Sequence, residues 1–408
     1  MADDTYEETM MSTVMPLNYI HGDLVLNVEN YYYDDDDNDS TSVNSSTLNL
    51  LRVLGPQRKA LSTVIPITIV YCVIFITGIV GNVSTCAVIA RKKYMHTATN
   101  YYLFNLAVSD LLLLILGLPQ ETYSFWHLYP YVFGEAFCRF RYLAAEASTN
   151  ASVLTITAFT IERYAAICHP MQKMPSSSNL KRAVRVICII WILSVVCAIP
   201  ISLQFGIIYS YAKSKAITES AQCNTVNEAE SKVYFQMSTF LFFVFPMTLI
   251  SILYFLIALA IKRSGINRNE SDLSGENESK EVDLRVKQKA QARQSVLNML
   301  VAVVVAFFVC WAPYHAQRLL VVYVKTWTPN LLKVHDILYY VSGIFYYFSS
   351  TINPILYSIM SLKFRQAFRS SLRCQLCTVK QLGTSCSYTY KFSKRISCSD
   401  TNVDSASV

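Results

Sequence analysis

The chain has 408 residues, of which 53% are hydrophobic and only 15% are charged. Soluble domains carry about 25% charged residues, so this composition excludes an ordinary soluble protein and favours a membrane protein. The net charge is +7, but acidic residues gather near the N-terminus and basic residues lie between apolar stretches. This division indicates membrane topology rather than nucleic-acid binding.

Residues 1–62 form an acidic segment of low complexity, for which we predict a disordered N-terminal tail. The run YYYDDDDND at 31–39 is too polar to contribute to a packed core. No basic and apolar leader begins the sequence, so we expect the first apolar span to direct membrane insertion. Asn38 and Asn44 begin glycosylation sequons, which are usable only if this tail lies outside the cell.

Apolar segments long enough to cross a bilayer as helices, about 20 residues each, follow the tail. They lie at approximately 63–90, 98–120, 136–168, 184–205, 234–262, 295–324 and 335–360. The sequence therefore predicts an all-α fold, an integral membrane bundle of seven transmembrane helices. With a short amphipathic helix at 362–372 after the last span, this domain covers residues 63–376.

Residues 377–408 are rich in Ser and Thr and are expected to form a disordered cytoplasmic tail that kinases can modify. Cys374 and Cys377 follow the amphipathic stretch directly. Cysteines next to a membrane-lying helix are typical sites of palmitoylation. We therefore predict that both are lipidated and that this end of the chain contacts membrane lipids.

Lys and Arg residues cluster after spans one, three and seven and between spans five and six. By the positive-inside rule these loops and the C-terminus are cytoplasmic, and the N-terminus is extracellular, in the plasma membrane. The loop at 264–282 is polar and is expected to be flexible. Residues 283–294 are charged and are expected to extend span six into the cytoplasm.

Of the 12 cysteines, only Cys138 and Cys223 fall in or beside the predicted outer loops. Oxidation is permitted on that side of the membrane, so we expect them to form a disulfide. Five further cysteines lie within the spans and are expected to be small buried apolar residues. They are Cys72, Cys86, Cys188, Cys197 and Cys310.

Span three contains Glu146, about 12 Å along the helix from Cys138 at 1.5 Å per residue. A carboxylate at that depth is costly unless it faces protein or water, and such residues are usually functional. The alternative is a carboxylate that is paired internally and has a structural role only. We take Glu146 as a candidate functional residue.

Arg318 lies two helical turns beyond Trp311, with His315 between them, so the three residues are expected to share one face. Together with Glu121 and Glu146, Arg318 gives the outer cavity two carboxylates and one guanidinium. This net negative balance suits a ligand with a cationic group, while Arg318 can hold a carboxylate or carbonyl. The expected aromatic walls are Tyr142, Phe205, Tyr314, Tyr339 and Tyr347.

Polar residues at bilayer depth gain stability only by meeting one another. We expect five of them to converge on water or on a sodium ion: Asn82, Asp110, Ser152, Ser349 and Asn353. One carboxylate with hydroxyl groups suits a hard cation. A purely structural polar cluster is the alternative.

Prolines interrupt spans five, six and seven at Pro246, Pro313 and Pro354. Each removes a backbone donor and creates a kink or pivot. Trp311 lies two residues before Pro313, and Phe307 lies one turn below it. A bulky indole on a pivoting helix can convert ligand pressure into helix movement, and it is also a packed core residue.

These residues form a pattern that resembles the rhodopsin-like G-protein-coupled receptors over roughly residues 60–376. The shared positions are Asn82, Asp110, Cys138, Glu162–Tyr164, Trp191, Pro246, Tyr254, Cys310–Pro313 and Asn353–Tyr357. Further motifs resemble the neuromedin U, pyrokinin and CAPA neuropeptide receptors, with the CAPA type favoured. They are GLPQE at 117–121, FW at 125–126, AAEAS at 144–148, TITAFTIER at 155–163 and PYHAQR at 313–318.

The resemblance implies an extracellular amidated peptide containing arginine, received by Glu121 and Glu146 with Arg318 nearby. It also implies signalling through a heterotrimeric G protein, mainly Gq and calcium, with receptor kinases and arrestin as further partners. No catalysis and no cofactor are expected, apart from an allosteric sodium ion. The alternative ligands are a pyrokinin or a neuromedin U-like peptide.

The resemblance also assigns roles at the cytoplasmic end. Glu162, Arg163 and Tyr164 are expected to couple to the G protein, with Glu162 holding Arg163 in the inactive state. Tyr254 and Tyr357 are expected to brace Arg163 after activation. A transporter or channel is disfavoured, because there is no internal repeat and only Asp110 provides a charge near mid-membrane.

Overall fold

The computed structural model describes residues 56–169, 176–212, 215–272, 280–324, 326–360 and 365–366. The predicted glycosylation sites Asn38 and Asn44, the predicted palmitoylation sites Cys374 and Cys377, and the C-terminal tail lie outside these ranges. Of the predicted amphipathic helix, only residues 365–366 are described, and they are helical.

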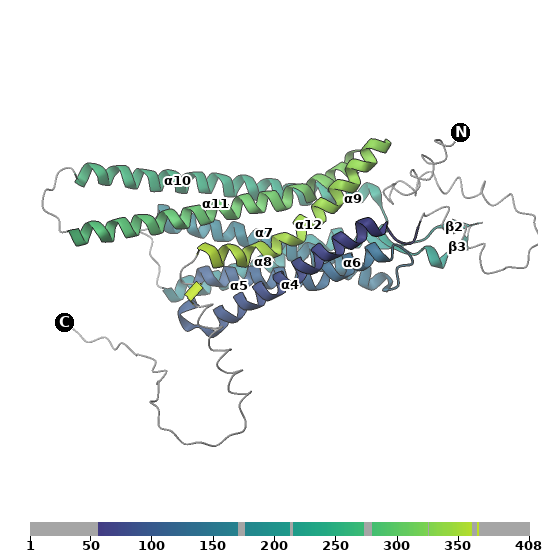
Figure 1. The fold of residues 1–408 in the computed structure, drawn as a ribbon, viewed down its shortest axis with the longest axis horizontal. Helices are drawn as coiled ribbons and strands as arrows, with labels where there is room; N and C mark the ends of the chain where they lie inside the picture. The colour runs from purple at the N-terminus through teal and green to yellow at the C-terminus, as the bar shows by residue number, and fades with distance from the viewer. Residues whose placement is uncertain are drawn as a thin grey trace, which may run out of the picture.

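Seven long helical rods run side by side through the described part of the chain (Figure 1). In chain order they are α4 (Leu61–Arg91); α5 (Ala98–Leu116) with α6 (Leu118–Trp126); α7 (Gly134–Cys168); α8 (Ser176–Leu203); α9 (Glu228–Thr239) with η3 (Phe240–Val244) and α10 (Phe245–Asp272); α11 (Lys280–Tyr323); and α12 (Pro329–Met360). Short 3-10 turns lie at η1 (Lys93–Met95) and η2 (Thr218–Ser220). The predicted helical bundle is confirmed.

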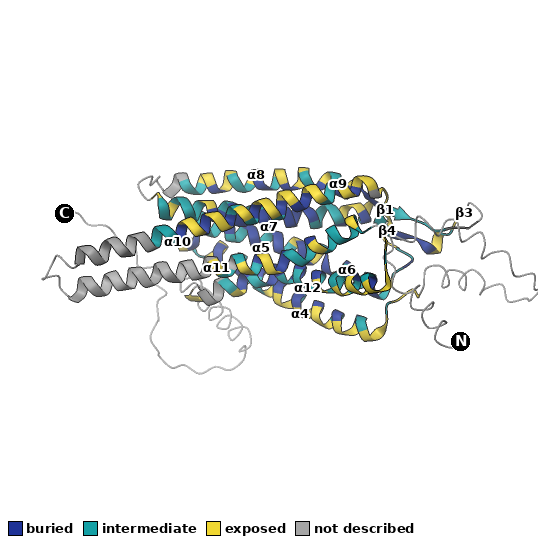
Figure 2. Ribbon diagram, turned by 90° about the horizontal axis from the view of Figure 1, so that it is seen from above, coloured by how far each residue is buried: buried dark blue, intermediate teal, exposed yellow. Residues whose placement is uncertain are grey.

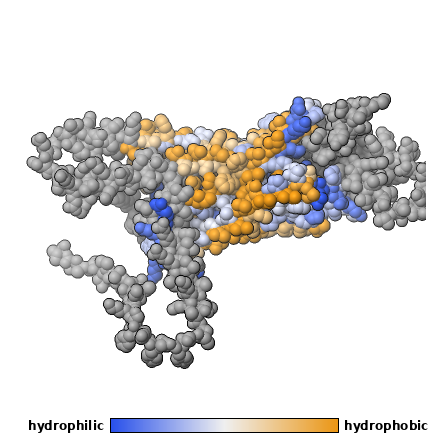
Figure 3. All heavy atoms as spheres, in the orientation of Figure 1, coloured by the Kyte–Doolittle hydropathy of each residue, from blue (hydrophilic) through white to orange (hydrophobic). Residues whose placement is uncertain are grey.

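The bundle turns apolar residues both inward and outward, as a membrane requires. Tyr71, Leu114 and Ile257 are almost fully buried between helices, whereas Ile192 and Phe255 are 64% and 65% exposed. Figure 2 shows buried residues on the inner faces of the helices and exposed residues on their outer faces. Figure 3 shows hydrophobic residues across the middle of the visible face and hydrophilic residues toward its ends.

Among the described residues, six helical segments are long and apolar enough by themselves to cross a membrane. The seventh rod, α12, is not among them, although its 32 residues exceed the required length. Its sequence is rich in Tyr, Ser and Asn, and many of these polar residues are buried against neighbouring helices. Such a helix is stabilised in a bilayer by the bundle that covers its polar groups.

Helix α7 lies at the centre of the bundle and packs against α5, α8 and α10, while α12 packs against α4, α5 and α11. The sequence predicted one continuous second span, but the rod is interrupted at Gly117 and continues as α6 to Trp126. Pro119 lies in the first turn of α6, where its missing backbone donor is tolerated. This junction positions Glu121.

The fifth rod begins at Glu228, earlier than the predicted residue 234, because Asn227 caps it by accepting a bond from the backbone of Glu230. A π-helical turn, η3, precedes Pro246. In it the Phe245 amide donates to the Phe240 carbonyl, five residues earlier. The wider turn lies where Pro246 provides no donor of its own.

Two antiparallel strand pairs occur where the sequence predicted only an outer loop. β1 (Phe205–Ile208) pairs with β4 (Gln222–Thr225), and β2 (Tyr211–Ala212) pairs with β3 (Lys215–Ala216). The register sets Ile207 opposite Cys223. These pairs provide hydrogen-bond partners for the backbone of the connection between α8 and α9.

Two other predictions were wrong. The loop predicted at 264–282 was too long at both ends, because α10 continues to Asp272 and α11 begins at Lys280. Polar side chains do not by themselves stop a helix that has already nucleated in the bundle. Of the cysteines expected to be buried, Cys72 and Cys188 are exposed on the outer surface of the bundle, and Cys310 is buried.

Candidate functional site

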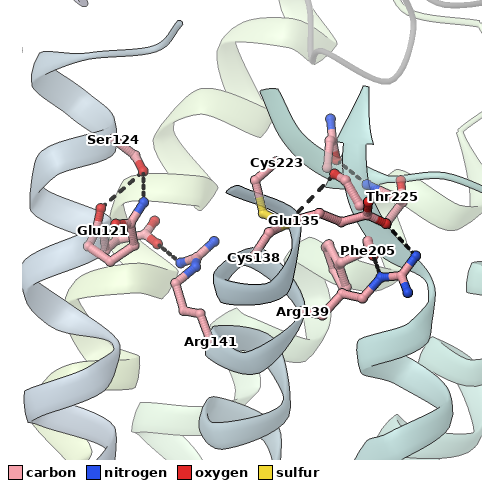
Figure 4. Close-up of a disulfide and its surroundings, with 12 residues drawn as sticks. Glu121, Ser124, Glu135, Cys138, Arg139, Arg141, Phe205, Cys223 and Thr225 are labelled. Atoms are coloured by element: carbon pink, nitrogen blue, oxygen red, sulfur yellow. Dashed lines mark hydrogen bonds and ion pairs between the residues drawn. A yellow bond between two sulfur atoms is a disulfide. The ribbon is translucent and has the colours of Figure 1, made fainter. Parts of the chain in front are cut away.

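The end of the bundle where α7 begins is held by a disulfide between Cys138 and Cys223, as predicted (Figure 4). The bond joins α7 to β4, with a Cα–Cα distance of 5.8 Å. Arg139 reinforces the junction by donating to the Phe205 carbonyl of β1 at 3.1 Å. We call this the disulfide end, and the opposite end of α7 the Arg163 end.

Glu121 lies on α6 at the disulfide end and is held by two groups from other helices. Arg141 of α7 donates to its Oε2 at 3.4 Å, and the Tyr339 hydroxyl of α12 donates to its Oε1 at 2.8 Å. The Arg141 guanidinium also lies over the Tyr142 ring, 4.3 Å from its centroid. We call Glu121, Arg141 and Tyr339 the Glu121 cluster.

Glu146 is the centre of a second arrangement of the same kind. Arg318 of α11 forms an ion pair with its Oε1, and the Tyr314 hydroxyl donates to the same oxygen at 3.2 Å. Glu146 is only 2% exposed, and the Arg318 guanidinium lies between the rings of Tyr314 and Phe235. We call Glu146, Arg318 and Tyr314 the Glu146 cluster.

The charge balance at the disulfide end differs from the prediction. We expected two carboxylates and one guanidinium, but Arg141 adds a second guanidinium, so each carboxylate has its own arginine. The two clusters together are formally neutral. Sequence reasoning missed Arg141, although the signal was present: a cationic residue on the same apolar helix as Glu146, one turn from Cys138.

A series of ring contacts connects the two clusters. Starting from the Glu146 cluster it runs Tyr314, Tyr346, Tyr347, Tyr71, Phe125 and Tyr339, with centroids 4.6 to 6.2 Å apart. Tyr347 is therefore part of the packed interior between the clusters. Tyr142 lies at the side, stacked on Phe205 with centroids 3.4 Å apart.

His315 does not turn toward Glu146. Its Nδ1 meets the Thr239 hydroxyl at 3.1 Å, and its ring stacks on Phe243 at 4.7 Å. Because Arg318 is three residues further along α11, about 60° short of a full turn, it faces α7 instead. His315 and Arg318 therefore face different neighbours, contrary to the predicted shared face.

Trp311 lies below the Glu146 cluster, within reach of its aromatic members. Its ring meets Tyr346 at 5.6 Å and Tyr314 at 6.1 Å, and stacks on Phe307 at 5.5 Å. Pro313 lies inside α11 next to these contacts. Tyr314 therefore contacts the indole that lies two residues before this proline.

Four of the five polar residues predicted to converge border one small cavity. It is bounded by Asp110, Ser152, Ser349, Asn353, Trp311, Phe307 and three aliphatic residues. Asn353 donates to Asp110 at 3.0 Å, and Ser152 donates to it at 3.5 Å. Asn82 instead donates to the Ser350 carbonyl of α12 at 2.7 Å, which joins α4 to α12.

At the Arg163 end, the expected pairing of Glu162 with Arg163 is replaced by contacts to other helices. Arg182 of α8 forms an ion pair with Glu162, 2.5 Å between Nη2 and Oε1. Arg163 donates to the Thr99 hydroxyl of α5 and lies over the Phe159 ring. Neighbouring residues on a helix point about 100° apart, so each meets a different helix.

The remaining predicted residues at this end have packing roles in the structure. Tyr254 is buried, and its hydroxyl lies 3.2 Å from that of Thr160 on α7. The Tyr164 ring meets His169 edge-on. The side chain of Tyr357 lies outside the described part of the chain, and Pro354 is buried within α12 next to Gly81.

Comparison with known proteins agrees with this architecture. Residues 81–357 match the family described as 7 transmembrane receptor (rhodopsin family). The chain is 44% identical to the pyrokinin-1 receptor of Drosophila melanogaster, with 79% of this chain and 83% of that protein covered. It is 40% identical to neuromedin-U receptor 2 of Mus musculus, with 82% of both covered, and to neuromedin-U receptor 1 of Homo sapiens, with 80% and 77% covered.

The family match spans the region from α4 to α12 and includes both carboxylate clusters, the disulfide and Arg163. It includes most of α12, which the sequence predicted as the seventh span although it is not among the six most apolar segments. The chain is a multi-pass membrane protein and belongs to the rhodopsin family of seven-transmembrane receptors.

Proposed function

We propose that this protein is a plasma-membrane receptor for an amidated neuropeptide that contains arginine, and that it signals through a heterotrimeric G protein. The observation that carries this proposal is the pair of partly or fully buried carboxylates, Glu121 and Glu146, at the disulfide end of the bundle. Relatives named as pyrokinin and neuromedin-U receptors support a peptide ligand.

In the proposed orientation the disulfide end faces the outside of the cell and the Arg163 end faces the cytosol. Peptide binding displaces Tyr314 or Arg318, and the ring contacts to Trp311 pass this displacement to α11 beside Pro313. The ligand acts only if it contacts the two states of α11 differently, since equal affinity for both shifts nothing. Release of Arg163 then opens the cytosolic end to the G protein.

The same account includes downstream partners. Coupling to Gq with calcium release, phosphorylation of the C-terminal tail by receptor kinases and binding of arrestin belong to this proposal. The motif resemblance favours a CAPA-type peptide, whereas the relatives named above favour a pyrokinin or neuromedin U-type peptide. One panel of synthetic peptide amides of all three types distinguishes them.

The experiment applies this panel to cells that express the full chain and records intracellular calcium, with and without a Gq inhibitor. We expect submicromolar responses to amidated peptides containing arginine and none to the free-acid forms. Responses only to non-amidated or anionic peptides would overturn the proposed ligand class. A tag at the N-terminus, labelled on intact cells, tests the orientation separately.

Two variants test the role of Glu146. Charge reversal to Lys is expected to abolish the response to the arginine peptide, because the reversed site repels both Arg318 and the ligand. Glu135→Lys is the matched control, since Glu135 is on the same helix but its side chain is 55% exposed and pairs with Arg139. Equal potency of the two variants would show that Glu146 has no ligand role.

We also propose that sodium binds beside Asp110 and modulates the receptor. The donor set supports this, because the Asp110 carboxylate and the hydroxyls of Ser152 and Ser349 border one cavity and oxygen donors suit a hard cation. Replacing sodium by N-methylglucamine is expected to change agonist affinity in the wild type and not in Asp110→Asn. Equal sodium dependence of the two would refute the site.

A further inference from the structure

Arg141 has more hydrogen-bonding capacity than its surroundings use. Its residue surface is 9% exposed, and its Nε is buried without a hydrogen-bond partner among the described residues. Its contact with Glu121, at 3.4 Å, is longer than the roughly 2.7–2.9 Å usual for a hydrogen bond between charged groups. Figure 4 shows the side chain extending from α7 toward α6, away from the disulfide.

The two carboxylates differ in how firmly they are held. The side chain of Glu146 is 3% exposed and receives Arg318 and Tyr314 on one oxygen. The side chain of Glu121 is 20% exposed, and its arginine is the more distant of the two. Each carboxylate also accepts one tyrosine hydroxyl, Tyr339 for Glu121 and Tyr314 for Glu146, so the difference lies in the arginines. We therefore expect a cationic ligand group to displace Arg141 from the more exposed Glu121 more easily than Arg318 from Glu146.

We propose that Arg141 is a specificity-determining residue that occupies Glu121 in the ligand-free receptor and competes with the guanidinium of the ligand. This inference rests on the proposed function. When the ligand's arginine takes Glu121, the released Arg141 guanidinium, with its unused Nε donor, binds a carbonyl oxygen of the peptide. A ligand must therefore offer a cation and a nearby acceptor together, which excludes small cations that lack the acceptor.

The probe is a pair of short synthetic peptide amides that differ at one position. One contains arginine, and the other contains citrulline, which has nearly the same shape without the charge. The measured quantity is the discrimination ratio, the half-maximal concentration of the citrulline peptide divided by that of the arginine peptide. Surface expression of each receptor variant is measured in parallel with an N-terminal tag.

Arg141→Gln is expected to increase the discrimination ratio by roughly tenfold. The reason is that Glu121 then has no internal cation and pairs more strongly with the guanidinium of the arginine peptide. Both peptides are also expected to lose potency, because neither retains the acceptor contact. Glu121→Gln is expected to lower the ratio below that of the wild type, with or without Arg141→Gln. Lys232→Gln, which changes an exposed cation on α9, is the control and leaves the ratio unchanged.

Arg141→Lys keeps the buried charge and decides the question if the glutamine variant is retained inside the cell. Lysine has a compact ammonium in place of the planar guanidinium of arginine, and it still places a positive charge beside Glu121. The discrimination ratio is therefore expected to rise above that of the wild type, but less than with Arg141→Gln. An unchanged ratio in the surface-expressed Arg141 variants would overturn the inference and leave Arg141 structural. If the wild type responds to neither peptide, the proposed function fails instead, so the two failures are distinguishable.

Discussion

Arg182 of α8 forms an ion pair with Glu162 of α7, 2.5 Å between Nη2 and Oε1, while the adjacent Arg163 donates to Thr99 of α5. The acidic residue next to Arg163 therefore forms its close ion pair with a neighbouring helix. These cross-helix contacts stabilise the arrangement in which Arg163 is engaged within the bundle.

The first prediction follows from this pair. Arg182→Gln is expected to raise agonist-independent signalling, because a contact that stabilises this arrangement is lost and the population shifts. The Arg182 side chain is 47% exposed, and a pair so exposed contributes at most about 1 kcal/mol, which limits the increase to about fivefold. Inositol phosphate accumulation without ligand measures it. Arg185→Gln, also exposed on α8, is the control, and an equal increase there would contradict the prediction.

Breaking the Glu146–Arg318 pair from one side is expected to destabilise the receptor strongly. Arg318→Met leaves a buried carboxylate without its cation, which costs about 3–5 kcal/mol. The double variant Glu146→Gln with Arg318→Met removes both charges and is expected to recover most of that loss. Thermal unfolding in detergent gives the stabilities and their coupling. Independent, additive effects of the two substitutions would show that the pair contributes little.

Removal of the disulfide is expected to reduce both stability and surface expression. Cys138 and Cys223 are separated by 85 positions, and a loop of that size corresponds to about 4–5 kcal/mol in the chain-entropy model. Cys138→Ser should also release β4 and disturb the hairpin beside Tyr142. Cell-surface labelling of this variant is compared with Cys188→Ala, whose cysteine is exposed on the outside of the bundle. Normal expression of Cys138→Ser would contradict the prediction.

Gly117→Ala is expected to disturb the junction that positions Glu121. An added Cβ would lie 2.7 Å from the Leu113 carbonyl oxygen and 3.0 Å from the Tyr347 hydroxyl, so the backbone or Tyr347 must shift. Overpacking of this kind costs about 1–3 kcal/mol, and agonist potency should fall because α6 moves. Adding Tyr347→Phe removes one of these contacts and should restore part of the potency. Equal agonist potency of Gly117→Ala with and without Tyr347→Phe would show that the contact with the Tyr347 hydroxyl does not cause the loss.

Several features were determined by the sequence alone. The apolar periodicity and lengths of the spans predicted the seven helices, because a bilayer allows few other structures for such segments. The positions of Cys138 and Cys223 predicted their disulfide. The depth of Glu146 and Asp110 indicated that both are candidate functional residues, because a charge in a bilayer is costly unless it faces protein or water.

Partner choice was decided only by the tertiary structure. Arg141 and Glu146 are five positions apart on α7, about 140° around the helix, so they meet different neighbours, α6 and α11. The sequence gives that angle but not the rotation of α7 in the bundle, which depends on packing against α5, α8 and α10. For the same reason Glu162 meets Arg182 instead of Arg163, and His315 turns toward Thr239. The orientation of the rigid helices therefore separates charges that are close in the sequence and pairs charges that are distant in it.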